Sequence, residues 1–325
     1  MKKNWLYLFF TTVIILTGCS SDHTISNGNL QMQINEEMQV KFSSLNENTK
    51  DIYNDFYVAD ELIAREFSAG EFELKNFEKS DNENLISYNI VGEFNEDGYK
   101  ITKHQKITIN KNFPDLLLFE TYYVNNGDKK ATITAWKNHE LRVENQNGEN
   151  LMWSFQPSST NKRQDWILPV EEGFYQKNYL GMNNSDYGGG IPMVNIWRKD
   201  GGIATGLTES TLKLVSMPVE WVRYEDYAKA ALLYEYENPV ILAKNDTIRT
   251  FDSFVAVHTG DFFNALQQFS AYMQAEKGIQ FPEPEPEAYE PVWCAWGYER
   301  QFTIDEVIGT LPKVKELGFK WVDGD

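Results

Sequence analysis

The sequence is poor in histidine, cysteine and basic residues, and these shortages exclude several classes of function. Its 325 residues include 30 Lys and Arg against 48 Asp and Glu, which gives a net charge of −18. Because contacts with phosphates need clustered Lys and Arg, this balance argues against nucleic-acid binding. The four histidines lack the spacing of metal ligands, so we predict no metal site. They are His23, His104, His139 and His258.

Long apolar runs are also scarce, and the most prominent one lies at the N-terminus. Two lysines precede "WLYLFFTTVIIL" (Trp5–Leu16), which is shorter than the roughly 20 apolar residues of a membrane-spanning helix. "LTGC" follows and resembles a bacterial lipobox, in which Cys19 takes the lipid. We therefore predict a lipoprotein signal peptide over residues 1–19 and a polar tether over residues 20–29. The alternative is an ordinary secretory signal with an incidental cysteine.

Lipidation of Cys19 would place the protein in a bacterial cell envelope, with the membrane as a partner through the lipid anchor. Ser20, in place of Asp, resembles the pattern of an outer-membrane destination, on the periplasmic or the surface face. Anchoring of this kind is strong because several acyl chains act together. Cys294, the second of two cysteines, would then form no intramolecular disulfide. We expect it to pack as a small apolar residue on a strand.

Strand patterns dominate residues 30–260, where helical periodicity is almost missing. "LISYNIVGEF" and "YKITKHQKITIN" alternate between apolar and polar residues, as half-buried strands do. Two β-rich runs flank Asn126-Gly127, a dipeptide suited to a positive-φ turn, and this predicts a hairpin over Asp115–Trp136. The fold class is therefore mainly β, and we predict a large β-sandwich of about a dozen or more strands.

A helix and a stiff connector follow the predicted sandwich over residues 261–291. Asp261 is a suitable N-cap, Gly278 is a natural stop, and apolar residues share one face of the helix between them. "FPEPEPEAYEP" then reads as a polyproline-like connector. The sharp change in composition predicts a domain boundary here.

Residues 292–325 read as strand, helix and strand. Val292–Trp296 is a short apolar run, and Thr303 with Glu306 forms a capping box at the start of an amphipathic helix. Gly318 ends that helix, although Pro312 removes one hydrogen bond and should bend it. "FKWVDGD" then predicts a buried strand that carries carboxylates at its C-terminal end, which is where the chemistry of β/α barrels takes place.

This last segment resembles the first strand, first helix and second strand of the barrel in clan D α-galactosidases, above all those of glycoside hydrolase family 36, the melibiases. A weaker likeness, to the large β-sandwich of that family, covers "NSDYGGGIPMVNIWRKDGGIATGL" (Asn184–Leu207). The resemblance implies that residues 292–325 are the truncated start of a (β/α)8 TIM barrel. It also implies a retaining hydrolase that needs no cofactor and has two catalytic carboxylates on later barrel strands, beyond Asp325.

The resemblance also implies the residues that contact the sugar. The family has paired aspartates before Gly-Trp, and here Asp325 aligns with the first of them, while an alignment shifted by two selects Asp323. Either one would bind substrate and would not be the nucleophile, and the alternative is a solvated loop acid. Asp186 and Tyr187 lie in "DYGGGIP", which opens a strand rather than a helix and so is no phosphate loop. The resemblance suggests a loop that reaches toward the sugar; the alternative is a flexible glycine turn.

Trp296 is the remaining candidate for the sugar site. Trp293 and Trp296 are an odd number of residues apart, so only one of them can face the interior of the barrel from a regular strand. Trp296 lies nearer the C-terminal end and is the better sugar platform, because the C–H-rich side of a pyranose is apolar.

Three functions remain open from the sequence. The first is an α-galactosidase-like retaining glycoside hydrolase of glycan degradation, represented here by an N-terminal fragment that lacks its catalytic carboxylates and is inactive alone. The second is a non-catalytic glycan-binding surface lipoprotein, and the third is a related barrel enzyme with another sugar specificity. In each case the expected partner is a carbohydrate. Because one helix and two strands cannot close a barrel, we expect the apolar side chains of residues 292–325 to lack partners.

Overall fold

The computed structural model describes residues 22–26, 28–44, 52–145, 151–156, 166–180, 191–199, 201–211, 213–280, 283–298 and 301–323. These residues form two compact units, the first reaching Gly278 and the second starting at Ile279. The described part of the first unit holds nineteen strands and one α-helix. None of the helices described has both the length and the apolar character needed to cross a membrane.

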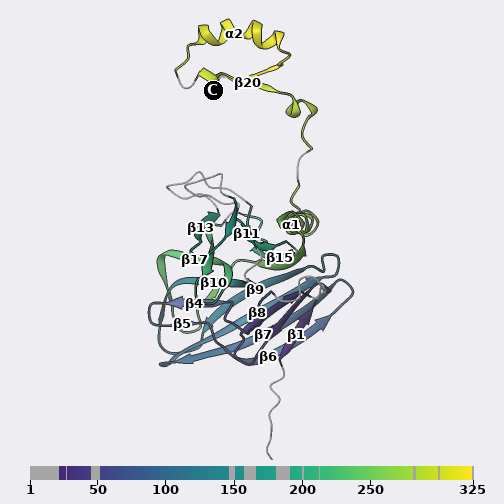
Figure 1. The fold of residues 1–325 in the computed structure, drawn as a ribbon. Helices are drawn as coiled ribbons and strands as arrows, with labels where there is room; N and C mark the ends of the chain where they lie inside the picture. The colour runs from purple at the N-terminus through teal and green to yellow at the C-terminus, as the bar shows by residue number, and fades with distance from the viewer. Residues whose placement is uncertain are drawn as a thin grey trace, which may run out of the picture. The chain divides into compact units, whose positions relative to one another are not determined.

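Three antiparallel sheets build the first unit (Figure 1). The smallest consists of β1 (His23–Ser26), β2 (Leu30–Ile34) and β3 (Val40–Ser44). The six-stranded sheet has the order β13 (Tyr175–Leu180), β16 (Val215–Val222), β17 (Tyr227–Leu242), β10 (Ala131–Glu144), β4 (Glu61–Ala64) and β5 (Ser68–Ala69). The ten-stranded sheet has the order β12 (Ile167–Val170), β11 (Met152–Phe155), β14 (Met193–Arg198), β15 (Gly201–Leu207), β19 (Ser253–Thr259), β9 (Leu116–Asn125), β8 (Tyr99–Asn110), β7 (Leu85–Glu96) and β6 (Glu73–Asp81), and β18 (Thr247–Arg249) pairs with β9.

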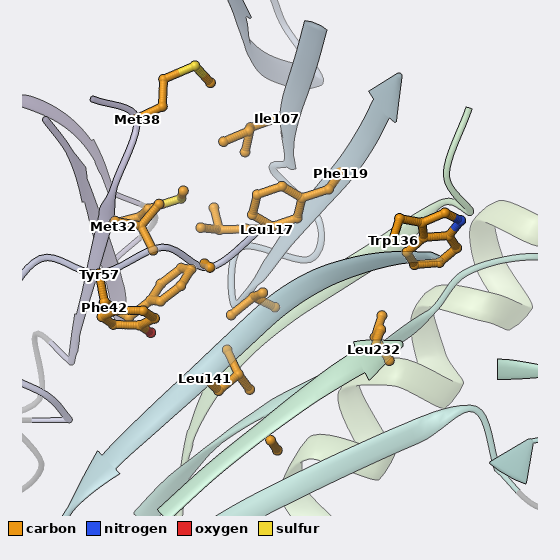
Figure 2. Close-up of a cluster of buried hydrophobic side chains, with 14 of the residues drawn as sticks. Met32, Met38, Phe42, Tyr57, Ile107, Leu117, Phe119, Trp136, Leu141 and Leu232 are labelled. Atoms are coloured by element: carbon orange, nitrogen blue, oxygen red, sulfur yellow. The ribbon is translucent and has the colours of Figure 1, made fainter. Parts of the chain in front are cut away.

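One hydrophobic core joins the three sheets (Figure 2). Phe42 enters it from the smallest sheet, Phe119 from the ten-stranded sheet, and Trp136 from the six-stranded sheet, and each is at most 2% exposed. Burying a large apolar side chain is worth about 1.5–3 kcal/mol, so a core of this extent is the main stabilising feature of the unit. The prediction of a large β-sandwich is confirmed.

The edge strand β6 closes one side of the ten-stranded sheet. Its sequence, ELKNFEKSD, carries five charged residues, and its last four residues, from Glu78 to Asp81, are exposed. The pairing with β7 is irregular between Leu74 and Asn76. From the smallest sheet, the ring of His23 stacks on Phe77, with ring centroids 4.2 Å apart.

The predicted hairpin around Asn126-Gly127 is wrong, although both of its strands exist. β9 pairs with β8, β18 and β19, whereas β10 pairs with β4 and β17, so the chain passes from one sheet to the other at this corner. The Asn125 side chain fixes the corner by donating to the carbonyl oxygens of Lys129 and Leu242, both at 2.8 Å. Its Oδ1 accepts from the Gly127 N–H at 2.9 Å. Burial of both strands in separate sheets therefore overrides the local preference for a two-residue turn.

Helix α1 (Phe262–Lys277) has the ends that the sequence predicts. Asp261 is its N-cap and accepts from the N–H of Phe263, and Gly278 ends it in a left-handed conformation at φ 67°. The helix packs on β14 and β19. Phe262 stacks on Phe155 of β11, and Phe269 stacks on Phe254 of β19. These aromatic contacts bury one face of the helix against the ten-stranded sheet.

The second unit consists of a parallel strand pair and the helix between them. Its elements are the 3₁₀ turn η2 (Pro286–Tyr289), β20 (Val292–Cys294), the 3₁₀ turn η3 (Ala295–Tyr298), α2 (Ile304–Glu316) and β21 (Trp321–Asp323). The predicted strand–helix–strand order is confirmed. Ala295 and Val314 are the buried apolar residues of its described part, while Ile308 and Trp321 are 57% and 46% exposed.

Candidate sugar-contacting site

The C-terminal ends of β20 and β21 form the edge on which the predicted sugar contacts lie. The two strands are parallel, with Cys294 opposite Asp323, so the segment that follows Cys294 begins beside Asp323. That segment is η3, and it carries Trp296 with half of its side chain exposed. The structure therefore brings Trp296 and Asp323 to the same edge of the strand pair. Cys294 contacts Asp323, with Sγ 3.7 Å from Oδ2.

Glu290 fastens the opposite, N-terminal ends of the two strands. Its carboxylate accepts from Lys320 Nζ and, at 2.9 Å, from Trp321 Nε1. The hydrogen bond from Lys320 and that from Trp321 together hold the pKa of Glu290 below its usual value. Because these contacts fix the start of β21 beside the start of β20, they also set the register that places Asp323 opposite Cys294.

Helix α2 links the two strands and is anchored at its start by the predicted capping box. The Thr303 hydroxyl accepts from the N–H of Glu306, and the Glu306 carboxylate accepts from the N–H of Thr303 at 2.7 Å. The hydrogen bond from the Thr303 N–H and a second one, donated to the same carboxylate by the Thr303 hydroxyl at 2.9 Å, lower the pKa of Glu306. At the other end the helix finishes before Gly318, which has a φ of 88°. The capping and stop signals predicted from the sequence are confirmed.

Three expectations about this edge are wrong. Trp296 lies on the 3₁₀ turn and not on the strand, so strand parity with Trp293 does not decide its direction. Cys294 is exposed rather than packed in a core. Strand β21 is exposed at all three residues, although the sequence predicts a buried strand. The two exposures share a cause: among the described residues β20 and β21 pair only with each other, so no further strand covers their sides. Val314, expected to lack partners, is buried.

Four predicted site residues lie outside the part of the chain that the structure describes. They are Cys19, Asp186, Tyr187 and Asp325. Their assignments therefore stay predictions, as does the choice between Asp323 and Asp325 as the residue that binds the sugar. The strand that "DYGGGIP" is expected to open is present as β14.

A buried polar network inside the sandwich was not predicted. Lys103 Nζ and Gln105 Nε2 both donate to Asp60 Oδ2 at 2.7 Å, and the N–H of His139 donates to Asp60 Oδ1 at 2.9 Å. Burial alone would raise the pKa of Asp60, but the Lys103 charge and these hydrogen bonds outweigh it and lower the pKa well below its usual value. Lys103 sits on an alternating strand that gave no sign of a buried charge. Only the fold brings the pair together, across 43 residues of sequence.

The same network contains a Ser–His–Asp series that resembles the residues of a hydrolytic triad. His139 Nε2 lies 2.7 Å from Ser253 Oγ, and its Nδ1 lies 3.6 Å from Asp60 Oδ1. A nucleophile must meet its substrate, however, and Ser253 and His139 are each 1% exposed. Burial lowers the pKa of His139 to about 4, which keeps its ring neutral. The series therefore serves packing and hydrogen bonding between the sheets, not acyl transfer.

No cluster of three or more His, Cys, Asp or Glu side chains that could hold a metal ion occurs among the residues described. Of the four histidines, His139 and His258 are buried in hydrogen-bonded positions, His258 beside Asn195. The rings of His23 and His104 stack on Phe77 and Tyr122.

Solved α-galactosidases share this fold at low sequence identity. The enzyme of Lactobacillus brevis superposes with a TM-score of 0.56 over 94% of this chain and 48% of its own, at 12% identity. The family 36 α-galactosidase AgaA of Geobacillus stearothermophilus, solved with raffinose, gives 0.54 over 93% of this chain and 49% of its own, at 11% identity. This chain therefore spans about half the length of the solved enzymes that it matches.

A curated relative matches part of the chain by sequence. The A type blood α-D-galactosamine galactosaminidase of Flavonifractor plautii is 29% identical over 143 residues, which are 43% of this chain and 13% of that protein. No protein-family model matches the chain. Together with the stacked sheets, the solved structures show that this chain has the β-sandwich fold found in the N-terminal region of family 36 α-galactosidases.

Proposed function

We propose that this chain belongs to an α-galactosidase-like retaining glycoside hydrolase, in which it supplies the sandwich and the first two barrel strands. The observation that carries the proposal is the match of solved α-galactosidases over more than nine tenths of the chain, across both of its units. The parallel pair β20–β21 with α2 between them is the repeating unit of a β/α barrel. AgaA was solved with raffinose, an α-galactoside that fits the proposed substrate class.

In this proposal the edge formed by Trp296 and Asp323 contacts sugar and does not cleave it. Cleavage with retention needs two carboxylates about 5–5.5 Å apart. At this edge the described residues provide Asp323, and Asp325 follows two residues later. We assign one of these aspartates to the sugar hydroxyls, and the nucleophile and the acid/base to later barrel strands outside these 325 residues. The exposed indole of Trp296 would cover the apolar face of the ring.

The test is hydrolysis of an aryl α-galactoside by the protein encoded by the whole reading frame. A charge-assisted hydrogen bond is worth roughly 1.5–3 kcal/mol, so Asp325→Ala should lower kcat/KM by more than tenfold. Asp323→Ala is measured beside it, and the larger loss identifies the aspartate that binds the sugar. Glu316→Ala, an exposed position on α2, is the matched control and should keep wild-type efficiency. Hydrolysis at wild-type efficiency in both aspartate variants would refute the assigned site.

We also propose that Cys19 carries the lipid that anchors the protein to the bacterial cell envelope, on its outer membrane. The motif "LTGC" directly behind the apolar run supports this. Replacing Cys19 with Ser should move the protein from the membrane fraction to the soluble fraction. Cys294→Ser, the other cysteine, is the control and should stay in the membrane fraction. A Cys19→Ser protein that sediments with membranes as before would contradict the proposal.

A further inference from the structure

A cleft rich in amide side chains lies in the sandwich unit, between α1 and the ends of strands β3, β8 and β19. Its volume is about 450 Å³, within the roughly 300–1,000 Å³ of small-molecule sites. Five Asn and Gln side chains are part of its lining, from α1 and from the loops that precede β2 and β9. They are Asn29, Asn112, Asn264, Gln267 and Gln268. All belong to one compact unit, and none belongs to the strand edge that carries Trp296 and Asp323.

The amides give the cleft donors and acceptors side by side. Each Asn or Gln side chain has one carbonyl oxygen and one NH₂ group, a combination that matches hydroxyl groups, which also donate and accept. Gln268 has a hydrogen-bonding group that the described residues leave without a partner. Its Nε2 donates to Asp115 Oδ2 at 3.4 Å, while its buried Oε1 has no hydrogen-bond partner among the described residues. A buried acceptor without a donor is unfavourable, so a hydroxyl of a bound molecule that reached Gln268 after a small rotation of its side chain would gain this hydrogen bond.

The charge in the cleft favours a neutral ligand. Asp115 and His258 are the titratable residues of its lining. Burial lowers the pKa of His258 to about 4, so this ring is neutral at ordinary pH. Asp115 remains, and it already accepts from Asn29 Nδ2 at 2.5 Å and from Gln268. Among the described lining residues no cation would offset this carboxylate for an anion, and a cation would have to compete with the hydrogen bonds that Asp115 already makes.

An aromatic side chain completes the lining. Phe113, half-buried in the loop between β8 and β9, contacts Tyr272 of α1 edge to face, with ring centroids 5.6 Å apart. This contact holds the ring in place. A ring next to several amides suits a molecule that has both an apolar C–H face and many hydroxyl groups.

We propose that this cleft binds a short neutral saccharide, at a site separate from the strand edge of the second unit. The site would hold a glycan without cleaving it, because its described lining residues include one carboxylate where retaining hydrolysis requires two. Its function does not depend on the proposed hydrolase activity.

The test is binding to the full chain, measured by saturation-transfer NMR and titration calorimetry. Galactose and raffinose are the neutral probes, and galacturonic acid and protonated galactosamine are their charged counterparts. Ala271 is exposed on α1 and lines the cleft, so Ala271→Trp should fill it without touching the core, and should abolish binding at the cleft. Gln268→Met keeps the shape of the side chain but removes the amide, and should weaken binding at least fivefold.

Two further variants test whether the sugar binds in this cleft and not elsewhere on the chain. Gln274→Ala changes the same residue type on the same helix outside the cleft, and should bind the neutral probes as the wild type does. Trp296→Ala removes the indole of the proposed substrate edge, so each cleft variant is also measured in the Trp296→Ala background, where the binding that remains is that of the cleft. Binding that survives Ala271→Trp in this background would overturn the proposal. So would equal binding of the charged sugars, or no binding of either neutral probe at millimolar concentrations.

Discussion

The two units of this chain obey the same local rules and differ in what covers them. Helix α1 is capped by Asp261 and packs its aromatic face on a ten-stranded sheet. Helix α2 has the more complete cap, a full capping box, yet Val314 is its one buried residue. Trp136 of the sandwich is 1% exposed, whereas Trp321 of the second unit is 46% exposed. Capping and periodicity thus define an element, but burial depends on the elements that pack against it.

The largest expected effect comes from truncating each of these two tryptophans. Trp136→Ala should lower the free energy of unfolding by about 3–5 kcal/mol, because it leaves a cavity among packed side chains. Trp321→Ala should cost less than about 1 kcal/mol, since it loses partly exposed surface and one hydrogen bond to Glu290. Urea unfolding followed by circular dichroism measures both. If both substitutions lowered the free energy of unfolding equally, Trp321 would have to be buried by packing that the structure does not show.

Removing one charge from an ion pair should likewise lower the free energy of unfolding more at a buried site than at an exposed one. Asp60→Asn should destabilise the sandwich by about 3 kcal/mol, because Lys103 would stay buried without a counter-charge. The matched control is Glu172→Gln, whose partner Arg223 lies at 2.8 Å and where both side chains are more than 60% exposed. Its effect should stay within about 0.5 kcal/mol. A small loss for Asp60→Asn would mean that water reaches Lys103.

The buried histidine of the network should make the stability of the sandwich depend on pH. The pKa of His139 is lowered to about 4 in the folded protein, against about 6.5 for an unfolded chain. Between these values the unfolded chain binds a proton that the folded protein does not, so stability falls as the pH falls. The slope from this group is up to about 1.4 kcal/mol per pH unit.

The His139→Asn variant tests this slope, because Asn tolerates the φ of 53° at this position. Urea unfolding at several pH values between 7 and 4 should show a shallower fall in stability than in the wild type. His258, whose pKa is also about 4, would account for part of the fall that remains. An unchanged slope would mean that His139 takes up its proton in the folded state.

The smallest expected effect compares the two helix caps. Asp261→Ala and Thr303→Ala should each cost about 1 kcal/mol. Because α1 packs on the core of the sandwich, loss of its cap should lower the urea midpoint of the whole sandwich. Loss of the α2 cap should instead speed hydrogen exchange in α2 alone. A change in the sandwich midpoint caused by Thr303→Ala would show that the two units are energetically coupled.

The sequence predicts those features that depend on neighbouring residues. The ends of α1, the capping box at Thr303 and the strands β7 and β8 follow from spacing of residues that are close along the chain. The edge that carries Trp296 and Asp323 follows in part from the sequence, since the predicted strands pair in parallel and place both residues at their C-terminal ends. Its role in binding sugar stays a prediction.

The features that the sequence does not predict depend on distant partners. The chain bends at residues 127–129 without the predicted positive-φ turn at Asn126-Gly127, since β9 finds its partners in β8 and β19, and β10 finds its own in β17. Likewise, the alternating pattern around Lys103 predicts an exposed side chain, whereas in the fold Lys103 is buried and donates to Asp60. Which strand or side chain pairs with which depends on the burial achieved by the whole fold, and no local sequence pattern contains that information.

The charged edge strand β6 has a consequence for the behaviour of the protein in concentrated solution. A sheet edge exposes unpaired N–H and C=O groups that can join the sheet of another molecule. β6 carries Glu73, Lys75, Glu78, Lys79 and Asp81, and its irregular pairing at Leu74 disturbs the flat outline that such joining requires. A second molecule approaching this edge would have to desolvate these charges before any ladder could form. We therefore expect this edge to resist self-assembly into extended sheets and fibres.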